Sequence, residues 1–392
     1  MIIEPKVRGF ICTTAHPDGC AAEVERQIAH VRETGEIDEG PRRVLVIGSS
    51  MGYGLSTRIA AAWGAGAATL GICLEKEASG RRTATAGWYN TAAFHRAARE
   101  EGLWAETLNR DAFAPETKEE VVELLREKLG PLDLVVYSLA APRRTLPDGS
   151  VAKSALKPIG DPYRNKTLDV STGEVSEVEI EPADQREIEE TVKVMGGEDW
   201  QLWIEALSDA ELLADGAITL AYSYIGPELT YPLYREGTIG RAKDHLEATA
   251  GRLDDRLRPG GRRALVSVNK AVVTQSSSAI PVVPLYISLL FRVMKNRGLH
   301  EGCIEQMGRL FSDRLYHGGE IPLDAEARVR MDDLEMRADV QREVRSRWDR
   351  VTDENLEELA DLEGYRRDFL RLFGFEVDEV DYGRDVDPHR SW

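Results

Sequence analysis

Residues 43–63 read RVLVIGSSMGYGLSTRIAAAW. A short β-branched run, a glycine-rich turn and an apolar helix-forming stretch together predict a strand, a loop and a helix. The glycines are Gly48, Gly52 and Gly54. A dinucleotide pyrophosphate needs such a tight turn, because backbone N–H groups at a helix N-terminus must approach its negative charge. We interpret the segment as a dinucleotide-binding turn; a turn with a purely structural role is the alternative.

The remaining chain continues this alternation of strands and helices. We expect strands at 67–74, 104–108, 132–139, 217–224 and 263–268, and helices at 90–101, 118–129, 200–213, after Gly237, at 279–297, at 301–314 and within 331–373. Residues from 141 to about 195 interrupt the pattern with prolines, including Pro142, Pro147, Pro158 and Pro162, and with an alternating run at 167–180 that predicts a hairpin. The prediction is an α/β fold over residues 1–392, a single elaborated Rossmann-type domain. It has a doubly wound parallel sheet, an inserted hairpin region and extra helices.

Composition narrows the classes of function. The formal net charge of −18 argues against nucleic-acid binding, which requires a positive surface. No stretch approaches the roughly 18–20 apolar residues of a membrane span, and the N-terminus lacks a signal-peptide pattern, so we expect a cytoplasmic protein. Four scattered cysteines and seven unclustered histidines predict neither a disulfide framework nor a metal site.

Acidic and small residues follow the predicted strands where a cofactor would lie. Glu75 ends the second strand, where a carboxylate accepts hydrogen bonds from ribose hydroxyls and repels a 2′-phosphate, which favours NADH. Arg81 and Arg82 nearby leave NADPH open. Asp111 follows the third strand and Leu139-Ala140 the fourth, where adenine and nicotinamide-ribose contacts usually come.

Residues 222–243, YSYIGPELTYPLYREGTIGRAK, carry a tyrosine and a lysine typical of short-chain reductases. The phenol supplies a proton or hydrogen bond, and the ammonium holds the nicotinamide ribose. Tyr234 and Lys243 are nine residues apart, about half a turn out of phase on one helix. Gly237 and Gly240 interrupt the interval, and Thr238 is a suitable N-cap. We therefore expect Tyr234 in a loop and Lys243 in the first turns of the following helix.

With these segments, the chain resembles a known family nearly from end to end. GSSMGYG, TAGWYNTAAF (85–94), SYIGP (223–227), YREGTIGRAK (234–243) and VNKAVVTQSSSAIP (268–281) are similar to the FabV-type enoyl-acyl-carrier-protein reductases and the trans-2-enoyl-CoA reductases. So is the opening PKVRGFIC with the following His16-Pro. The interval of eight residues between tyrosine and lysine distinguishes this family from relatives with three or six.

The resemblance implies a role for each matched position. It implies that Tyr234 is the catalytic proton donor, that Tyr224 contacts the substrate and that Lys243 binds the cofactor. It further implies an NADH site lined by Gly48, Ser49, Ser50, Met51, Gly52, Tyr53, Leu74, Glu75, Asp111, Ala112, Leu139, Ala140, Val272, Val273 and Thr274. The substrate would be an enoyl-CoA or enoyl-acyl carrier protein of fatty acid biosynthesis. A monomer is one option for the oligomeric state.

The expected reaction is NADH-dependent reduction of the 2,3 double bond of a trans-2-enoyl thioester. Hydride goes to the β-carbon, and Tyr224 and Tyr234 stabilise the enolate oxygen. Two alternatives stay open: a 3-ketoacyl (carbonyl) reductase with Ser223 as its catalytic serine, and a non-catalytic NADH-sensing protein.

The insertion also suggests a place for an anionic carrier. Its first part, residues 141–166, contains six basic residues against Asp148 and Asp161, and we hypothesise that they bind coenzyme A phosphates or an acidic carrier protein, a solvated loop being the alternative. The six are Arg143, Arg144, Lys153, Lys157, Arg164 and Lys166. The apolar run 281–294 either borders the acyl chain or packs in the core.

Overall fold

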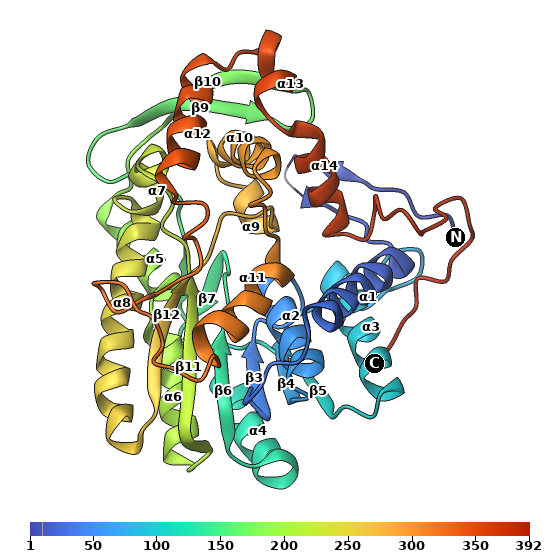
Figure 1. Ribbon diagram of the computed structural model, residues 1–392, viewed down its shortest axis with the longest axis vertical. Coiled ribbons are helices and arrows are strands. Elements are labelled where there is room, and N and C mark those ends of the chain that lie inside the picture. Colours follow the sequence, from blue (N-terminus) through green and yellow to red (C-terminus); the bar gives the residue numbers. More distant parts are fainter. Residues whose placement is uncertain (10) are drawn as a thin grey trace.

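A seven-stranded parallel sheet forms the centre of the computed structural model, which describes residues 1–9 and 11–392 (Figure 1). Phe10, part of the opening motif, lies outside the described residues. The strand order is β13-β12-β11-β6-β3-β4-β5, and every neighbouring pair is parallel. The strands are β3 (Arg43–Ile47), β4 (Ala68–Cys73), β5 (Ala105–Asn109), β6 (Leu132–Tyr137), β11 (Leu213–Ser223), β12 (Arg263–Val268) and β13 (Val329–Arg330). The predicted doubly wound sheet is confirmed.

Helices cover both faces of this sheet, as its continuous apolar strands require. Val44 and Val46 of β3 pack toward one face, and Leu45 and Ile47 toward the other. The first face is covered by α1 (Pro17–Thr34), α2 (Gly52–Ile59), α3 (Ala86–Glu100) and α11 (Cys303–Leu310). The second face is covered by α4 (Pro115–Leu124), α6 (Glu198–Asp209) and α8 (Thr238–Leu257).

A third apolar cluster lies beyond the carboxyl ends of the strands. It joins residues that follow β11 and β12, such as Leu233 and Val273, to the C-terminal helices and the hairpin at the top of Figure 1. Its elements include β9 (Tyr163–Asp169), β10 (Glu174–Ile180), α10 (Val283–Asn296), α12 (Ala338–Arg350), α13 (Leu356–Leu359) and α14 (Leu362–Arg371). Most of α10 is buried against α12 and α14, so core packing accounts for most of the apolar run 281–294.

The insertion contains the predicted hairpin and additional structure. The β9–β10 pair turns at residues 170–173, and a helix that we did not predict, α5, closes the segment with a capping box between Asp184 and Glu187. The helix α1 also escaped prediction, as did several elements of two to four residues, which are too short to give a usable period. The short ones include β1 (Val7–Arg8), β2 (Ile11–Cys12), β7 (Arg143–Thr145), β8 (Val151–Lys153), α9 (Gln275–Ser278) and β13; α5 spans Gln185–Met195.

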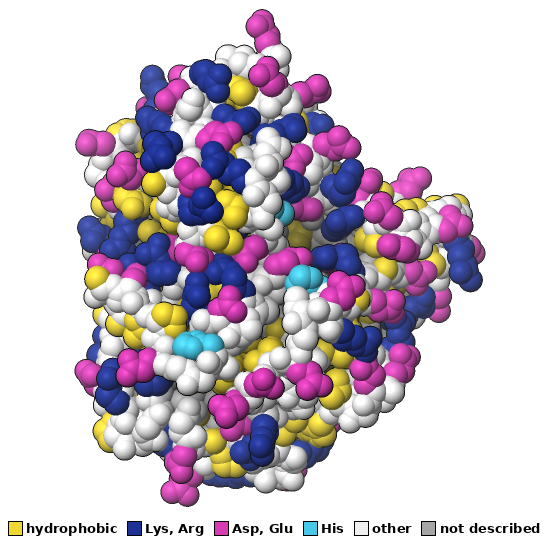
Figure 2. All heavy atoms as spheres, viewed as in Figure 1, with side chains coloured by type: hydrophobic (Ala, Val, Ile, Leu, Met, Phe, Trp, Pro, Cys, Tyr) yellow, Lys and Arg dark blue, Asp and Glu magenta, His cyan; other side chains and the backbone are white. Residues whose placement is uncertain are grey.

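The hypothesis that all six basic residues of the insertion form a patch for an anionic carrier is wrong. Arg144 is 2% exposed and pairs with Glu198 at 2.6 Å, and Lys157 pairs with Glu187 at 2.6 Å. Arg164 pairs with Glu179, and Lys166 donates to backbone carbonyls, including that of Trp348 at 2.9 Å. Only Arg143 and Lys153 have no such partner among the described residues. Figure 2 shows acidic and basic side chains interspersed over the visible face, in keeping with such pairing.

We predict that Arg144→Met lowers the free energy of unfolding by roughly 3 kcal/mol. The substitution removes the guanidinium group that lies 3.9 Å from the buried Asp199 carboxylate. Chemical denaturation monitored by circular dichroism measures the change. Arg143→Met is the matched control, because Arg143 is exposed. A stable Arg144→Met variant with a raised Michaelis constant for the thioester would contradict this structural role.

Candidate functional site

The glycine loop lies where the strand order of the sheet reverses, between β3 and β6. Ligands of doubly wound sheets bind in the crevice at this position. Gly48 has φ +87°, and a Cβ there would lie 2.1 Å from the carbonyl oxygen of Ser138. A Cβ on Gly54 would lie 1.8 Å from the carbonyl oxygen of Gly48. The glycine spacing therefore lets the loop backbone fold tightly between the end of β6 and the start of α2.

We predict that Gly54→Ala weakens NADH binding by about tenfold or more, since the new methyl group displaces the Gly48 carbonyl and the N–H groups beside it. Isothermal titration with NADH measures the loss. Gly251→Ala on α8 is the control, because no atom would lie within 4 Å of its Cβ. Equal affinities for the two variants would show that this close contact does not shape the cofactor loop.

Glu75 is held at the carboxyl end of β4 by its neighbours. Ser50 donates from its hydroxyl to Glu75 Oε1 at 2.7 Å, which links the glycine loop to this carboxylate. Asn109, at the end of β5, pairs with the Glu75 backbone in both directions, at 2.7 and 3.0 Å. Leu74 is 70% exposed beside them. Sequence reasoning missed Asn109, although a polar residue ending a predicted strand was an available signal.

The other segments of the predicted cofactor site end neighbouring strands. Asp111 follows β5 and accepts from the Phe113 backbone N–H at 2.9 Å, and Ala112 accepts from Lys118 Nζ at 2.9 Å. Residues 139–140 follow β6 beside Gly48, and 272–274 follow β12, where Thr274 caps α9. Tyr53 donates to the Lys270 carbonyl at 2.6 Å, which ties the glycine loop to this last segment. The fold thus gathers these positions at one edge of the sheet.

Tyr234 and Tyr224 meet beyond the end of β11. Tyr234 is the last residue of a short helix, α7 (Tyr231–Tyr234), rather than part of a loop as we expected. It is 8% exposed, and its ring lies edge-on to that of Tyr224, with centroids 4.8 Å apart. Burial raises the pKa of both phenols above their usual range. Each phenol therefore keeps its proton at neutral pH and can donate it to a substrate oxygen.

Lys243 lies in the second turn of α8, as the spacing predicted. The expectation that Thr238 is the N-cap is wrong: Gly237 occupies that position, and Thr238 begins the helix. The Thr238 hydroxyl instead donates to the Ala155 carbonyl of the insertion. Lys243 is buried and donates to the Tyr222 carbonyl at 3.4 Å, and burial lowers its pKa to about 8, opposed by Glu247.

We predict that NADH affinity falls as pH rises through about 8, because the Lys243 ammonium is charged below this pKa and neutral above it. Fluorescence titration with NADH across this range measures the dissociation constant. Lys243→Met, which has no charge to lose, should bind weakly at every pH. A dissociation constant of the unmodified protein that does not change with pH would contradict the prediction.

Glu335 completes the site from a distant part of the chain, the segment between β13 and α12. It is fully buried; its Oε1 accepts from the Tyr286 hydroxyl at 2.6 Å and forms a hydrogen bond of 3.1 Å with the Tyr224 hydroxyl. Its Oε2 accepts from the Ala271 backbone N–H at 2.7 Å. Sequence reasoning missed Glu335, because it counted the residue within an acidic helical stretch and no pattern marks it as buried.

Comparison with family models assigns three consecutive parts of the chain to one enzyme. Residues 2–80 match the NAD(P)H binding domain of trans-2-enoyl-CoA reductase, and residues 82–316 match the trans-2-enoyl-CoA reductase catalytic region. Residues 323–386 match a model described as an enoyl reductase FAD binding domain.

The residues of this last part do not fit a flavin. They form the two-residue strand β13 and the helices α12, α13 and α14, and within this range no glycine loop joins a strand to a helix as in a dinucleotide site. Apolar residues such as Val344, Trp348 and Phe369 are buried in the third core cluster. We derive no step through a flavin.

Relatives of nearly equal length share more than half of their residues with this chain. The enoyl-[acyl-carrier-protein] reductase [NADH] of Opitutus terrae is 57% identical over 390 residues, 99% of each chain. The trans-2-enoyl-CoA reductase [NADH] of Ruminiclostridium cellulolyticum is 55% identical over 388 residues, covering 99% of this chain and 98% of the relative.

Two solved structures have nearly the same fold. The trans-2-enoyl-CoA reductase of Treponema denticola in complex with NAD superimposes with a TM-score of 0.96 at 51% identity, covering 100% of this chain and 99% of the other. The Clostridium acetobutulicum enzyme in complex with NADH has a TM-score of 0.96 at 45% identity, covering 99% and 98%.

Proposed function

Because the chain belongs to the trans-2-enoyl-CoA reductase family, we propose that it reduces the 2,3 double bond of trans-2-enoyl thioesters with NADH at this site. The observation that supports this role most directly is the edge-on pair of the buried Tyr234 and the half-buried Tyr224 beyond the end of β11. Two protonated phenols side by side suit an oxygen atom that becomes negative during the reaction.

We infer that the positions gathered at the switch point hold the cofactor, which supplies a hydride when it is bound. The N–H groups of 48–53 would meet the pyrophosphate, and Glu75 the adenosine ribose hydroxyls. Lys243 would hold the nicotinamide ribose. Asp111-Ala112, Leu139-Ala140 and 272–274 would border the remaining groups. The Glu75 carboxylate repels a 2′-phosphate, which supports NADH over NADPH.

The tyrosines then account for the chemistry on the substrate. Hydride reaches the β-carbon of the enoyl thioester, the double bond opens, and its electron pair moves to the thioester oxygen as an enolate. Tyr224 and Tyr234 donate hydrogen bonds to this oxygen, which lowers the barrier by several kcal/mol. A proton supplied from or through Tyr234 reaches the α-carbon, and the product is the saturated thioester.

The alternative of a carbonyl reductase would need Ser223 as its catalytic serine. Its side chain is buried, and its Oγ has no hydrogen-bond partner in the part of the chain that the structure describes. A catalytic serine of that kind would hydrogen-bond the substrate carbonyl beside the tyrosine. Oxidation of NADH with crotonyl-CoA, and not with acetoacetyl-CoA, separates the two activities. A non-catalytic NADH sensor would oxidise NADH with neither.

We propose that residues 1–392 act as one unit rather than as separable domains. The N-terminal amine donates to the Val386 carbonyl at 2.6 Å, and Tyr89 of α3 donates to the Pro388 carbonyl at 2.7 Å. Glu335 joins the part matched by the third family model to Tyr224 of the catalytic region. Each part therefore supplies contacts that another needs.

The carrier of the acyl group is coenzyme A or acyl carrier protein, since relatives of 55–57% identity are named for either one. Steady-state rates with matched thioesters of both carriers discriminate between them.

We propose a cytoplasmic enzyme. In the described residues, no helix is long and apolar enough to cross a membrane. The working expectation for its oligomeric state is a monomer.

We predict that Tyr234→Phe lowers the turnover number by about 100-fold or more, because the phenol that stabilises and protonates the enolate is lost. NADH affinity should stay close to that of the unmodified protein. Stopped-flow oxidation of NADH with crotonyl-CoA measures turnover. Tyr231→Phe, three residues earlier and half-buried, is the matched control and should retain its activity. Near-normal turnover of Tyr234→Phe would remove this residue from the mechanism.

A further inference from the structure

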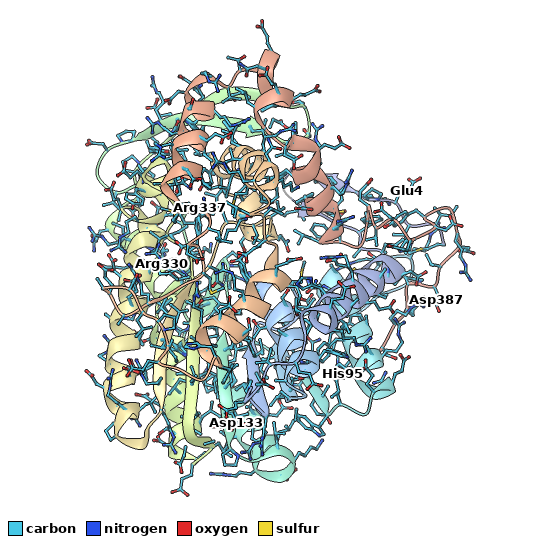
Figure 3. All side chains as sticks on the ribbon, in the orientation of Figure 1. Glu4, His95, Asp133, Arg330, Arg337 and Asp387 are labelled. Carbon is cyan, nitrogen blue, oxygen red and sulfur yellow. The ribbon has the colours of Figure 1, made fainter. Side chains whose placement is uncertain are left out.

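The carboxyl group of Glu335 connects the substrate side of the site to the cofactor side. Its Oε1 contacts Tyr224, and its Oε2 contacts the backbone just before residues 272–274. Figure 3 labels Arg330 and Arg337, which flank the segment that carries Glu335. Arg330 fixes this segment through a two-point contact with Asp332 at 2.7 Å.

Two of the three hydrogen bonds to this carboxyl group have a fixed direction. The Ala271 N–H can only donate to Oε2. Gln341 of α12 donates from Nε2 to the Tyr286 hydroxyl oxygen at 3.1 Å and to the Glu335 backbone carbonyl at 2.8 Å. In the described residues, Glu335 Oε1, 2.6 Å away, is the acceptor that the Tyr286 hydrogen reaches, and a reversed bond would leave this buried hydrogen without an acceptor. The bond between Glu335 and Tyr224 is the one that a substrate oxygen could free to run in either direction.

The direction of this third bond determines what Tyr224 can offer the substrate. A tyrosine hydroxyl has one hydrogen. If Glu335 is ionised, it can only accept, and it takes the Tyr224 hydrogen. If Glu335 carries a proton, it can donate to the Tyr224 oxygen, and the Tyr224 hydrogen is free for the thioester oxygen.

We propose that Glu335 is a positioning residue for Tyr224: its neutral carboxyl group donates to the Tyr224 hydroxyl and thereby turns the Tyr224 hydrogen toward the thioester oxygen. This proposal rests on the proposed function, in which Tyr224 contacts that oxygen. It adds a third participant to the two tyrosines, contributed by a segment that the catalytic family model does not reach.

The surroundings favour the neutral form. Burial raises the pKa of Glu335, and Asp332 acts in the same direction. Lys270, the Tyr286 hydroxyl and the Ala271 N–H oppose this shift. The Lys270 ammonium donates to the Ala271 carbonyl at 2.8 Å. The titratable or charged groups facing Glu335 include Tyr53, Tyr224, Tyr234, Lys270, Tyr286 and Asp332.

The test is the pH dependence of kcat/KM for crotonyl-CoA at saturating NADH, between about pH 5.5 and 9.5. In the unmodified enzyme, kcat/KM should fall as pH rises through the pKa of Glu335, because the ionised carboxylate takes the Tyr224 hydrogen. Glu335→Gln should stay within about threefold of the low-pH value and lack this decline. Its amide oxygen can accept from Ala271, and its NH₂ group can donate to the hydroxyl oxygens of Tyr224 and Tyr286 at every pH, although the Tyr286 hydrogen then loses its acceptor.

Tyr286→Phe provides a second test that leaves Glu335 in place. Loss of a donor to the carboxylate raises the pKa of Glu335, so the decline should move to higher pH. Titration of NADH binding over the same pH range identifies any decline of kcat/KM that comes from Lys243. Deprotonation of Lys243 weakens NADH binding, whereas ionisation of Glu335 does not. If Glu335→Gln does not fold, the Tyr286→Phe variant tests the proposal alone. A decline of its kcat/KM at the same pH as in the unmodified enzyme would reject the proposal.

Tyr224→Phe separates this inference from the function on which it rests. Full activity of Tyr224→Phe would reject the substrate contact itself. Two results together would reject only the role of Glu335. These are reduced activity of Tyr224→Phe, and a kcat/KM of Glu335→Gln that declines with pH as in the unmodified enzyme. Absence of any decline in the unmodified enzyme would also reject it.

Discussion

The helices α10, α12 and α14 pack with the residues that follow β11 into one apolar cluster beyond the carboxyl ends of the sheet, where Tyr234 is buried and Tyr224 is half-buried. Much of the chemistry depends on this burial. Because burial disfavours charged groups, both tyrosines stay protonated while the pKa of Lys243 falls to about 8. Hydrogen bonds to an enolate are also stronger there than at a wet surface.

Burial of these groups requires that each polar atom be given a partner. Residues distant in sequence provide several of these partners. Glu335 forms hydrogen bonds with the hydroxyls of Tyr224 and Tyr286, and Gln341 donates a hydrogen bond to Tyr286. The same principle holds on the other side of the sheet, where the buried Lys118 and Asp199 pair at 2.9 Å. A buried polar group without a partner destabilises the folded protein. The position of each side chain in such a network therefore depends on the positions of the others.

The insertion contributes to the site by support rather than by charge. The Thr238 N–H donates to the Lys157 carbonyl at 3.0 Å, and the Lys157 N–H donates to the Thr238 hydroxyl at 3.2 Å. These bonds anchor the start of α8, the helix that carries Lys243. The prolines and basic residues that suggested a carrier surface are thus largely committed to internal contacts, and the position of the catalytic helix depends on the segment inserted before it.

Local patterns in the sequence were sufficient for the parallel sheet, most helices, the glycine loop and the placement of Lys243 in the first turns of a helix. Each of these follows from a period, a turn residue or a spacing that a short segment carries by itself. The role of Glu335, the pairing of Arg144 with Glu198 and the true N-terminus of α8 depended on the tertiary structure. These features join residues tens to more than a hundred positions apart, and burial, which sets the partner and charge state of a polar side chain, arises only when such segments pack together.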